Sequence, residues 1–336
     1  MYLQYFNFKL EPFALVPDSD FLFLSRTHKK ALLYLNYALW NHNNFTLISG
    51  DVGTGKTILL QHVLKTVPED SIVITINQTQ ISPIELLEVV ANKIGFINAK
   101  KNNKASLYKL INGFFSHYKD RTIVFIIDEA QRLPIETLEE LRLLVSNDLN
   151  KKDSNINVIL CGQPELREII ESPKLEQLDQ RIRLKFDLKR LNRIETIEYI
   201  RYRLTRAGQT LDLFSNESLA RIYQYTNGLP RKINLIADTA LTCAFADGIT
   251  SITTTQVDDA ASELQWEKPD DETSLNNCTT LLGTDKIIRL KPIKKLLTEV
   301  ERGKFEGLKA IEIQLSRIAD SLETLSSTKE INIKSK

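Results

Sequence analysis

The chain has 336 residues, of which 42% are hydrophobic and 26% are charged, and its formal net charge at pH 7 is +1. This composition is ordinary for a soluble globular protein and leaves room for two domains. Because the net charge is close to zero, nothing in it demands nucleic acid or an anionic membrane, and any anion-binding surface must be local.

Cysteine usage and targeting patterns indicate the cytoplasm. The three cysteines are far apart, odd in number and form no CxxC pair, which argues against a disulfide framework and a thiolate zinc site. The first residues lack the pattern of a secretion signal, and no stretch approaches the roughly 20 apolar residues that span a bilayer. We expect a cytoplasmic protein without a direct membrane span, with peripheral attachment at the inner membrane as an open alternative.

Five short apolar runs, separated by helical patterns, predict an α/β domain. Their nearly continuous hydrophobicity is typical of strands buried on both faces of a parallel sheet. The alternation favours a parallel five-stranded sheet flanked by helices over residues 1–190, preceded by an N-terminal arm. The five runs are FTLIS (45–49), SIVITIN (71–77), RTIVFIID (121–128), INVILCG (156–162) and IRLKFDL (182–188).

Beyond residue 190 the strand patterns stop and helical patterns continue. Asn192 and Glu195 have the spacing of an N-terminal capping pair. Glycines follow three of the helical stretches, at the positions where C-terminal caps fall. Residues 191–266 are therefore predicted to form an all-helical lid domain. The three glycines are Gly208, Gly228 and Gly248.

The remaining residues carry weaker patterns. Residues 267–285 are polar and aperiodic and predict a linker, and residues 286–336 predict a basic helix followed by a heptad tail. The tail spans about two and a half heptads, fewer than a free-standing coiled coil needs, so we expect it to pair with a partner helix or dock on its own core. Its apolar residues are Leu308, Ile311, Leu315, Ile318, Leu322 and Leu325.

The stretch GDVGTGKT follows the first strand and opens a helix, which is the context of a phosphate-binding P-loop. Its glycines let backbone N–H groups turn toward phosphates, and the helix adds its positive dipole end. Lys56 would hold the β- and γ-phosphates, and the Thr57 hydroxyl would ligate Mg²⁺. A chance glycine-rich loop is the weak alternative. The predicted nucleotide-binding residues are Gly50, Asp51, Val52, Gly53, Thr54, Gly55, Lys56 and Thr57.

The third strand ends in two carboxylates, Asp128 and Glu129. In a P-loop enzyme the aspartate lies beside the metal, so Asp128 is predicted to ligate Mg²⁺ together with Thr57. Glu129 is suited to polarise the attacking water as a general base. Because both carboxylates are intact, we expect hydrolysis of ATP to ADP and phosphate and not binding alone.

With GDVGTGKT, FIIDEAQ and an all-helical second domain, the chain resembles the AAA+ ATPases. The stretch MYLQYFNFKLEPFALVPDSDFLFLSRTHKKALLYLNYAL before the P-loop resembles, more narrowly, the ExeA/GspA-like family of bacterial secretion and pilus-assembly ATPases. The resemblance covers residues 1–265 and implies ATP and Mg²⁺ as cofactors. Many members continue into a membrane-spanning helix and a peptidoglycan-binding domain, so a shorter, MshM-like form is expected here.

The resemblance also implies roles for residues outside the Walker motifs. Gln163 stands at the family's sensor 1, and Arg231 in GLPRKIN stands at its sensor 2. Asn77 resembles the residue that restrains the Walker B glutamate until a ligand binds. Arg181 in LDQRIRL resembles an arginine finger that acts in trans, with Arg183 as the competing candidate. A finger in trans would require an oligomer, as a ring or a helical assembly.

The adenine pocket is implied around residues 21–24 and His28, in the N-terminal segment. A simple hydrophobic anchor for the arm is an equally open interpretation of the same residues.

Three hypotheses remain for the task of the ATPase. In the first, the chain oligomerises with ATP and acts on a secretion or pilus assembly apparatus through protein contacts. In the second, it is an ATP-dependent DNA-binding regulator of transposition, because the same branch resembles TnsC-type helpers that assemble on duplex DNA. A signalling ATPase with an unknown partner is a third hypothesis.

Three basic segments support the DNA hypothesis through phosphate contacts: 99–104, 150–152 and 286–304. Short lysine-rich runs are usually solvated surface, and the last segment could equally lie on anionic lipid. The candidate DNA or anionic surface consists of Lys100, Lys101, Lys104, Lys151, Lys152, Lys291, Lys294 and Lys295.

Overall fold

The computed structural model describes residues 2–16, 18–40, 45–78, 80–96, 103–149, 156–209 and 212–268, all of which belong to one unit, Met1–Asp270. Nearly all of the predicted linker, and the whole of the predicted basic helix and heptad tail, lie outside the described residues. So do all the lysines of the candidate anionic surface except Lys104.

The sheet has five strands in the order β2-β3-β4-β1-β5, and every neighbouring pair is parallel. The three central strands are buried at every position, whereas the edge strands β2 and β5 are buried only in part. All five predicted strands are confirmed, with ends that differ by at most two residues from the apolar runs, because both-face burial is what those runs report. The strands are β1 (Phe45–Gly50), β2 (Ile72–Ile76), β3 (Ile123–Ile127), β4 (Ile156–Gly162) and β5 (Ile182–Leu188).

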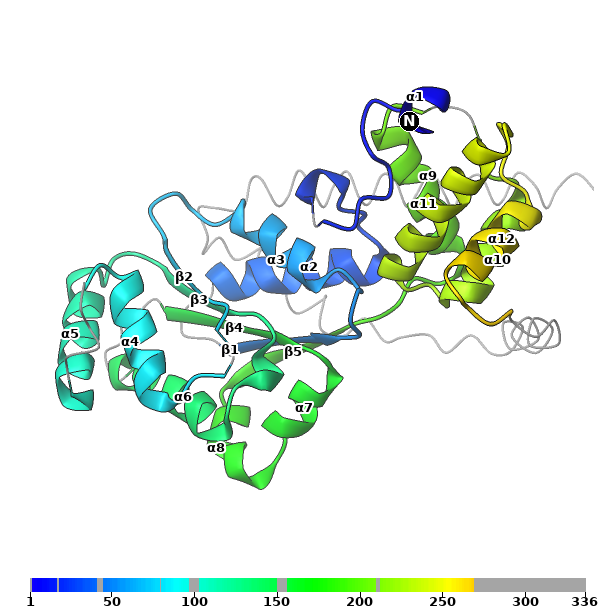
Figure 1. The fold of residues 1–336 in the computed structure, drawn as a ribbon. Helices are drawn as coiled ribbons and strands as arrows, with labels where there is room; N and C mark the ends of the chain where they lie inside the picture. Colours follow the sequence, from blue (N-terminus) through cyan, green and yellow to red (C-terminus); the bar gives the residue numbers. More distant parts are fainter. Residues whose placement is uncertain are drawn as a thin grey trace, which may run out of the picture. The chain divides into compact units, whose positions relative to one another are not determined.

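Helices cover both faces of the sheet (Figure 1). One face packs Ile48, Val124 and Ile159 against α2 and α3. The opposite face packs Leu47 and Phe125 against α4, α5 and α6. Successive strand residues face opposite sides, so both faces need an apolar cover. The helices are α2 (Arg26–Trp40), α3 (Lys56–Leu64), α4 (Pro83–Lys93), α5 (Lys104–His117), α6 (Ile135–Leu149), α7 (Pro164–Ile170) and α8 (Glu176–Asp179).

Four helices follow β5, over the residues predicted as the lid domain, and we call them the lid; its separation as a domain stays a prediction. The predicted capping pair starts the first of them: Asn192 Oδ1 accepts from Glu195 N at 2.9 Å, and Asn192 N donates to the Glu195 carboxylate at 3.1 Å. The second of them is capped by Asn227, whose φ of 46° is left-handed, and Gly228 follows with a φ of 71°; a Cβ on Gly228 would overlap the Leu191 carbonyl oxygen, so only glycine fits. The lid helices are α9 (Arg193–Arg206), α10 (Asn216–Thr226), α11 (Pro230–Ala246) and α12 (Thr254–Glu263).

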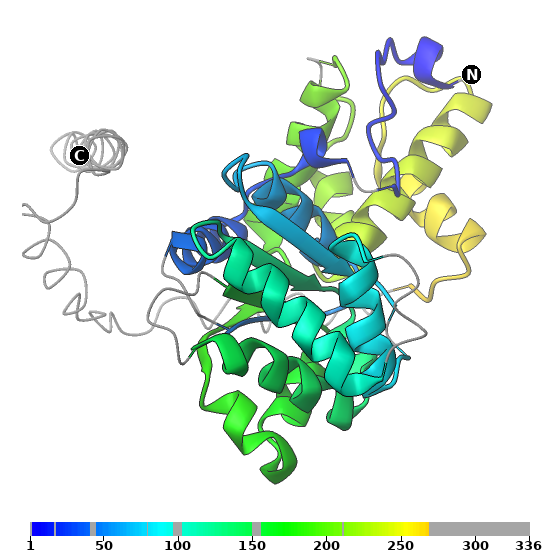
Figure 2. The same ribbon diagram turned by 90° about the vertical axis from the view of Figure 1, so that its left-hand side faces the viewer.

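The N-terminal arm, which includes α1 (Tyr2–Tyr5) and the 3₁₀ turn η1 (Ser19–Phe21), shares the core of the lid. In Figures 1 and 2 the dark-blue arm lies beside α9 and α11. Its buried aromatic side chains belong to the same apolar cluster as the lid residues. The arm therefore connects the lid core to α2, which packs on the sheet domain. The buried arm residues are Phe6, Phe8, Phe13 and Phe21.

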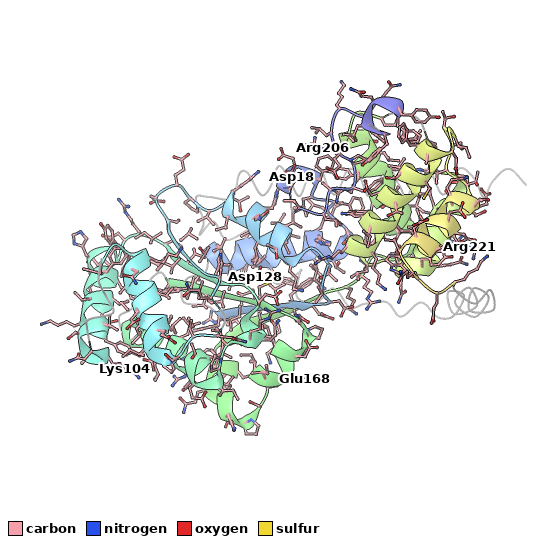
Figure 3. All side chains as sticks on the ribbon, in the orientation of Figure 1. Asp18, Lys104, Asp128, Glu168, Arg206 and Arg221 are labelled. Carbon is pink, nitrogen blue, oxygen red and sulfur yellow. The ribbon has the colours of Figure 1, made fainter. Side chains whose placement is uncertain are left out.

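Helix α5 is not among the helices predicted from the sequence. It starts where Asn103 caps the N–H of Ser106, and its first residue, Lys104, donates to the Glu140 carboxylate on α6 at 2.8 Å. Figure 3 shows Lys104 on α5. Its charge is thus partly matched inside the fold, which weakens its candidacy for an anion-binding surface. Within the described ranges, no helix combines the length and hydropathy that a membrane span requires.

Candidate nucleotide-binding site

The P-loop connects β1 to α3, and the Lys56 side chain bonds back to the start of the loop. Gly53 and Gly55 have φ angles of 85° and 98°, in the left-handed region that glycine adopts without strain. Lys56 is 6% exposed, and its ammonium donates to the carbonyl oxygens of Gly50 at 2.7 Å and Asp51 at 2.9 Å. A buried ammonium bonded only to neutral carbonyls has no full counter-charge in these contacts, which suits it to bind phosphate.

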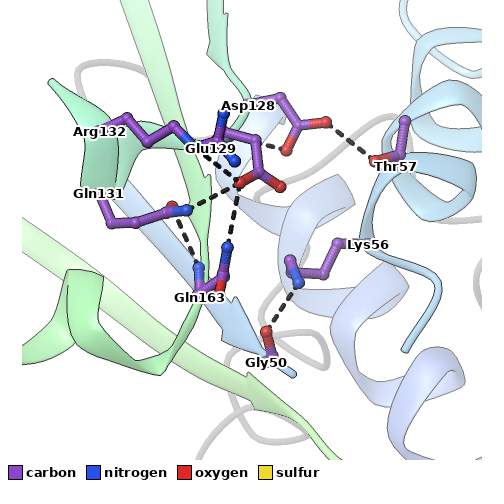
Figure 4. A network of polar contacts seen from close by, with 8 residues as sticks. All are labelled: Gly50, Lys56, Thr57, Asp128, Glu129, Gln131, Arg132 and Gln163. Atoms are coloured by element: carbon purple, nitrogen blue, oxygen red, sulfur yellow. Dashed lines mark hydrogen bonds and ion pairs between the residues drawn. The ribbon is translucent and has the colours of Figure 1, made fainter. Parts of the chain in front are cut away.

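Two oxygen ligands for a metal meet at the end of the sheet. The Thr57 hydroxyl, from the first turn of α3, donates to Asp128 Oδ2 at 2.9 Å, just beyond β3 (Figures 3 and 4). Mg²⁺ prefers oxygen ligands and is usually held by one or two protein groups plus phosphate oxygens. Thr57 and Asp128 therefore fit the predicted Mg²⁺ site.

Glu129 sits in a polar network with residues from two neighbouring strand ends (Figure 4). Its Oε2 atom accepts from Gln131 Nε2 at 2.8 Å and from Gln163 Nε2 at 3.3 Å. Arg132 Nε lies 3.7 Å from the same oxygen. The structure thus brings the predicted general base and the predicted sensor 1 residue together. Their catalytic roles stay predictions.

A pocket of about 320 Å³ extends from the P-loop to the lid and the arm. Arg231, at the N-terminus of α11, lines it and donates its backbone N–H to the Gly53 carbonyl at 3.3 Å. A Cβ on Gly53 would lie 2.6 Å from the Arg231 Cβ, so the loop and the lid approach as closely as glycine permits. This places the predicted sensor 2 residue beside the P-loop.

His28 also lines the pocket, beside the P-loop. Its Nδ1 lies 2.7 Å from Ser25 Oγ, and its Nε2 lies 3.1 Å from the Thr54 carbonyl oxygen, so it ties the arm to the P-loop. Burial lowers the pKa of His28 below its ordinary value of 6.5. Phe21, Leu22 and Phe23 also line the pocket, and Phe21 and Phe23 pack in the lid cluster. The adenine pocket and the simple hydrophobic anchor both stay open interpretations of residues 21–24.

Two predicted residues are not joined to this network. Asn77 is exposed just beyond β2, and the described contacts of Glu129 do not include it. Arg181 is half-buried before β5, and burial, followed by the charge of nearby Arg142, lowers its pKa. The Arg181 Nη1 atom is buried without a hydrogen-bond partner among the described residues. Both assignments stay predictions, and Arg183 is exposed on β5.

Sequence reasoning missed three polar residues of the site. Gln131 is one, although it stands within FIIDEAQ. Arg190 is another; its Nε lies 2.6 Å from Asp51 Oδ2 of the P-loop. Arg203 of α9 is the third. It is 6% exposed and donates to the Pro12 carbonyl at 2.5 Å and the Tyr199 hydroxyl at 2.8 Å. Of the three, only Gln131 could have been found from the sequence, because it stands three positions after Asp128.

Comparisons with known proteins agree with this architecture. The family model described as AAA domain matches residues 40–170. General secretion pathway protein A from Aeromonas hydrophila is 34% identical over 266 residues, which cover 79% of this chain and 48% of that protein. The chain thus spans about half the length of this curated relative.

Solved structures share the fold at low sequence identity. Cdc6p from Pyrobaculum aerophilum has a TM-score of 0.60 at 15% identity and covers 74% of this chain and 71% of its own. The Aeropyrum pernix ORC1 protein in complex with DNA has a TM-score of 0.55 at 14% identity, with 76% and 69% covered. The Thermotoga maritima RuvB Holliday junction branch migration motor has a TM-score of 0.50 at 18% identity, with 86% and 80% covered.

The family match falls on the stretch that holds the P-loop and Glu129, and the likeness of fold extends into the lid. The chain is therefore an AAA+ ATPase. Within that class it belongs to the ExeA/GspA-like proteins, since its similarity to General secretion pathway protein A continues beyond the AAA domain over most of this chain.

Proposed function

We propose that this chain hydrolyses ATP to ADP and phosphate with Mg²⁺, assembles into an oligomer when ATP is bound, and acts on a bacterial secretion or pilus assembly apparatus. The ATPase assignment is carried by one observation: Lys56, Thr57 and Glu129 line the same pocket, and the Thr57 hydroxyl donates to Asp128. The biological role is supported by the similarity to a protein named for general secretion.

Each part of the site has a defined task in this proposal. The P-loop N–H groups and Lys56 bind the phosphates, and Arg231 adds a lid cation beside Gly53. Thr57 and Asp128 would hold Mg²⁺, which would supply positive charge against the phosphates. Glu129 takes a proton from the attacking water. The Gln163 amide donates to the Glu129 carboxylate, so it would sense a change in the charge of that group.

Self-association is proposed from Arg181. Its Nη1 atom is buried without a described partner, and two guanidinium groups, those of Arg181 and Arg142, lie near a single carboxylate, Glu139. Such a cluster has spare positive charge for an anionic group of a neighbouring subunit. In this proposal the group is the nucleotide phosphate, and the contact would raise turnover by ~10³–10⁵.

The ATPase and the assembly are tested together. Phosphate release and light scattering are measured on the full chain with ATP and with a non-hydrolysable analogue. Wild type should release phosphate and form larger species with the analogue, whereas Lys56→Ala should do neither. Release that persists in Lys56→Ala would contradict the assignment of the P-loop.

The biological role is tested in a deletion strain. Secreted proteins and surface pili should be reduced and should recover with the wild-type gene but not with Lys56→Ala. Duplex DNA binding, measured by fluorescence anisotropy across a salt series, tests the alternative. Strong nucleotide-dependent binding with a steep salt slope would favour the transposition-type regulator. That regulator stays a prediction, because its basic residues other than Lys104 lie outside the described residues.

A further inference from the structure

Gln131 connects the end of β3 to the end of β4, next to the reaction centre. We propose that Gln131 is a positioning residue for ATP hydrolysis: it holds the carboxylate of Glu129 and links it to the backbone of Gln163, so that base and sensor move together. The inference rests on the proposed ATPase function and adds a residue to it.

The orientation of the Gln131 amide follows from its partners. The backbone N–H of Gln163 donates to Gln131 Oε1 at 3.2 Å. Because a backbone N–H requires an acceptor, the oxygen of the amide must face Gln163 and its nitrogen must face the other way. There Nε2 donates to Glu129 Oε2 at 2.8 Å, the shortest contact of this carboxylate in Figure 4.

The local backbone is built to place this amide. Gln131 lies in the 3₁₀ turn η3 (Ala130–Arg132), which is closed by the Arg132 N–H donating to the Glu129 carbonyl at 3.0 Å. A Cβ on Gly162, the last residue of β4, would collide with Gln131 Oε1. The glycine thus leaves the room that the bridging amide occupies, and a side chain there would expel it.

The backbone of Glu129 itself needs support. Its φ of 53° and ψ of 36° lie in the left-handed region, which is costly for a residue with a Cβ and persists only where surrounding contacts hold it. The amides of Gln131 and Gln163 both fall on Oε2. The carboxylate is thereby held by one oxygen, and its rotation relative to the end of β4 is restricted.

A mechanical link follows from these contacts. Any displacement of the Gln163 backbone is passed through the Gln131 amide to the Glu129 carboxylate, because the two hydrogen bonds share one planar group. The resemblance implies that Asn77 restrains Glu129. Among the described contacts, it is Gln131 that donates the shorter hydrogen bond to the Glu129 carboxylate. Loss of the bridge should therefore reduce kcat and leave the binding of ATP, measured through KM, nearly unchanged.

The test compares Gln131→Met and Gln131→Glu with wild type in steady-state ATP hydrolysis. Met has a similar length and removes both hydrogen bonds of the amide, so kcat should fall at least tenfold, the loss expected when one hydrogen bond to a charged group is removed. Glu keeps an oxygen that can accept from the Gln163 N–H but cannot donate to Glu129, so its kcat should fall as well.

KM should stay near the wild-type value in both variants, because Gln131 is not among the residues that line the pocket. Gln4→Glu adds the same charge at an exposed position on α1 and should behave as wild type. Thermal unfolding and binding of a fluorescent ATP analogue establish that each variant is folded. If the Met variant does not fold, the kcat and KM of the Glu variant decide.

The inference is overturned if a folded Gln131 variant retains wild-type kcat, or if KM rises in proportion to the fall in kcat. Its failure is separable from failure of the proposed function. If the wild-type chain shows no phosphate release that depends on Lys56, the ATPase proposal is wrong. If wild type hydrolyses ATP and the Gln131 variants do so at the same rate, only the proposed role of Gln131 is wrong.

Discussion

The two walls of the nucleotide pocket are built in different ways. The sheet side consists of the P-loop and the ends of β3 and β4, where each functional group follows a fully buried strand. The arm and lid side combines residues that are about 190 positions apart, such as Pro12 and Arg203. Strand ends in a parallel sheet converge by construction, whereas the second wall exists only when two distant segments pack together.

This difference explains where each wall is vulnerable. A substitution on the sheet side removes one chemical group from a framework that stays folded. A substitution on the other side loosens the cluster that holds the arm against the lid. It should lower the free energy of unfolding more than it lowers the rate of ATP hydrolysis. The predictions below separate the two, from the largest expected effect to the smallest.

Lys56→Ala should have the most complete effect, because loss of binding also removes turnover. It removes the buried ammonium that donates to Gly50 and Asp51 and that would bind phosphate, so the affinity for ATP should fall by about 100-fold or more. Calorimetric titration with Mg-ATP measures this, with Lys93→Ala, exposed on α4, as the matched control. Retained affinity would show that the P-loop is not the binding site.

Glu129→Gln should abolish turnover without loss of binding. A general base contributes ~10²–10⁴ to a rate, and the amide cannot take the proton of water. We expect kcat to fall by about that factor and the ATP-bound species to accumulate, as measured by phosphate release and light scattering. Glu168→Gln, on α7 in Figure 3, is the control. Hydrolysis at the wild-type rate would mean that another group is the base.

Arg203→Met tests the arm and lid side. Its guanidinium binds the Pro12 carbonyl and the Tyr199 hydroxyl and lies 5.0 Å from the centre of the Phe21 ring. Leaving these buried partners unpaired should destabilise the fold by about 3 kcal/mol. Thermal unfolding checks this against Arg201→Met, which is exposed on the same helix. Equal melting temperatures for the two variants would mean that Arg203 does not hold the arm.

His28 should produce the smallest effect of the four on the pH dependence of stability, and that effect lies in acid. Its pKa is lowered in the folded state by burial, so the unfolded chain binds the proton more readily. Its contribution is fully present above pH 6.5, is lost as the pH falls from there through the folded pKa, and changes by at most about 1.4 kcal/mol per pH unit. His28→Gln should flatten the loss of stability between pH 6.5 and pH 5, followed by denaturant unfolding. An unchanged slope would assign that loss to other groups.

Much of the sheet side could be predicted from the sequence. Runs such as IVFII and INVILCG are apolar at successive positions, and a strand buried on both faces requires that pattern. The P-loop and the Asp128–Glu129 pair follow two such runs directly, so their side chains were expected at one edge of one sheet. The lid helices were equally legible, because Asn192 and Gly228 mark helix ends through local backbone chemistry.

Only the tertiary structure decided how the pocket is closed and how Glu129 is held. Phe6 and Phe21 have no local pattern that assigns them to the lid core, and a buried Arg203 looks in the sequence like any surface arginine on a helix. Gln131 follows β3, but its partner Gln163 follows β4. Which strands lie next to each other cannot be read from the sequence of either strand alone. The sequence by itself determined the chemical groups of this ATPase, because they are local. Their support was decided by contacts between distant segments, because packing depends on the whole chain.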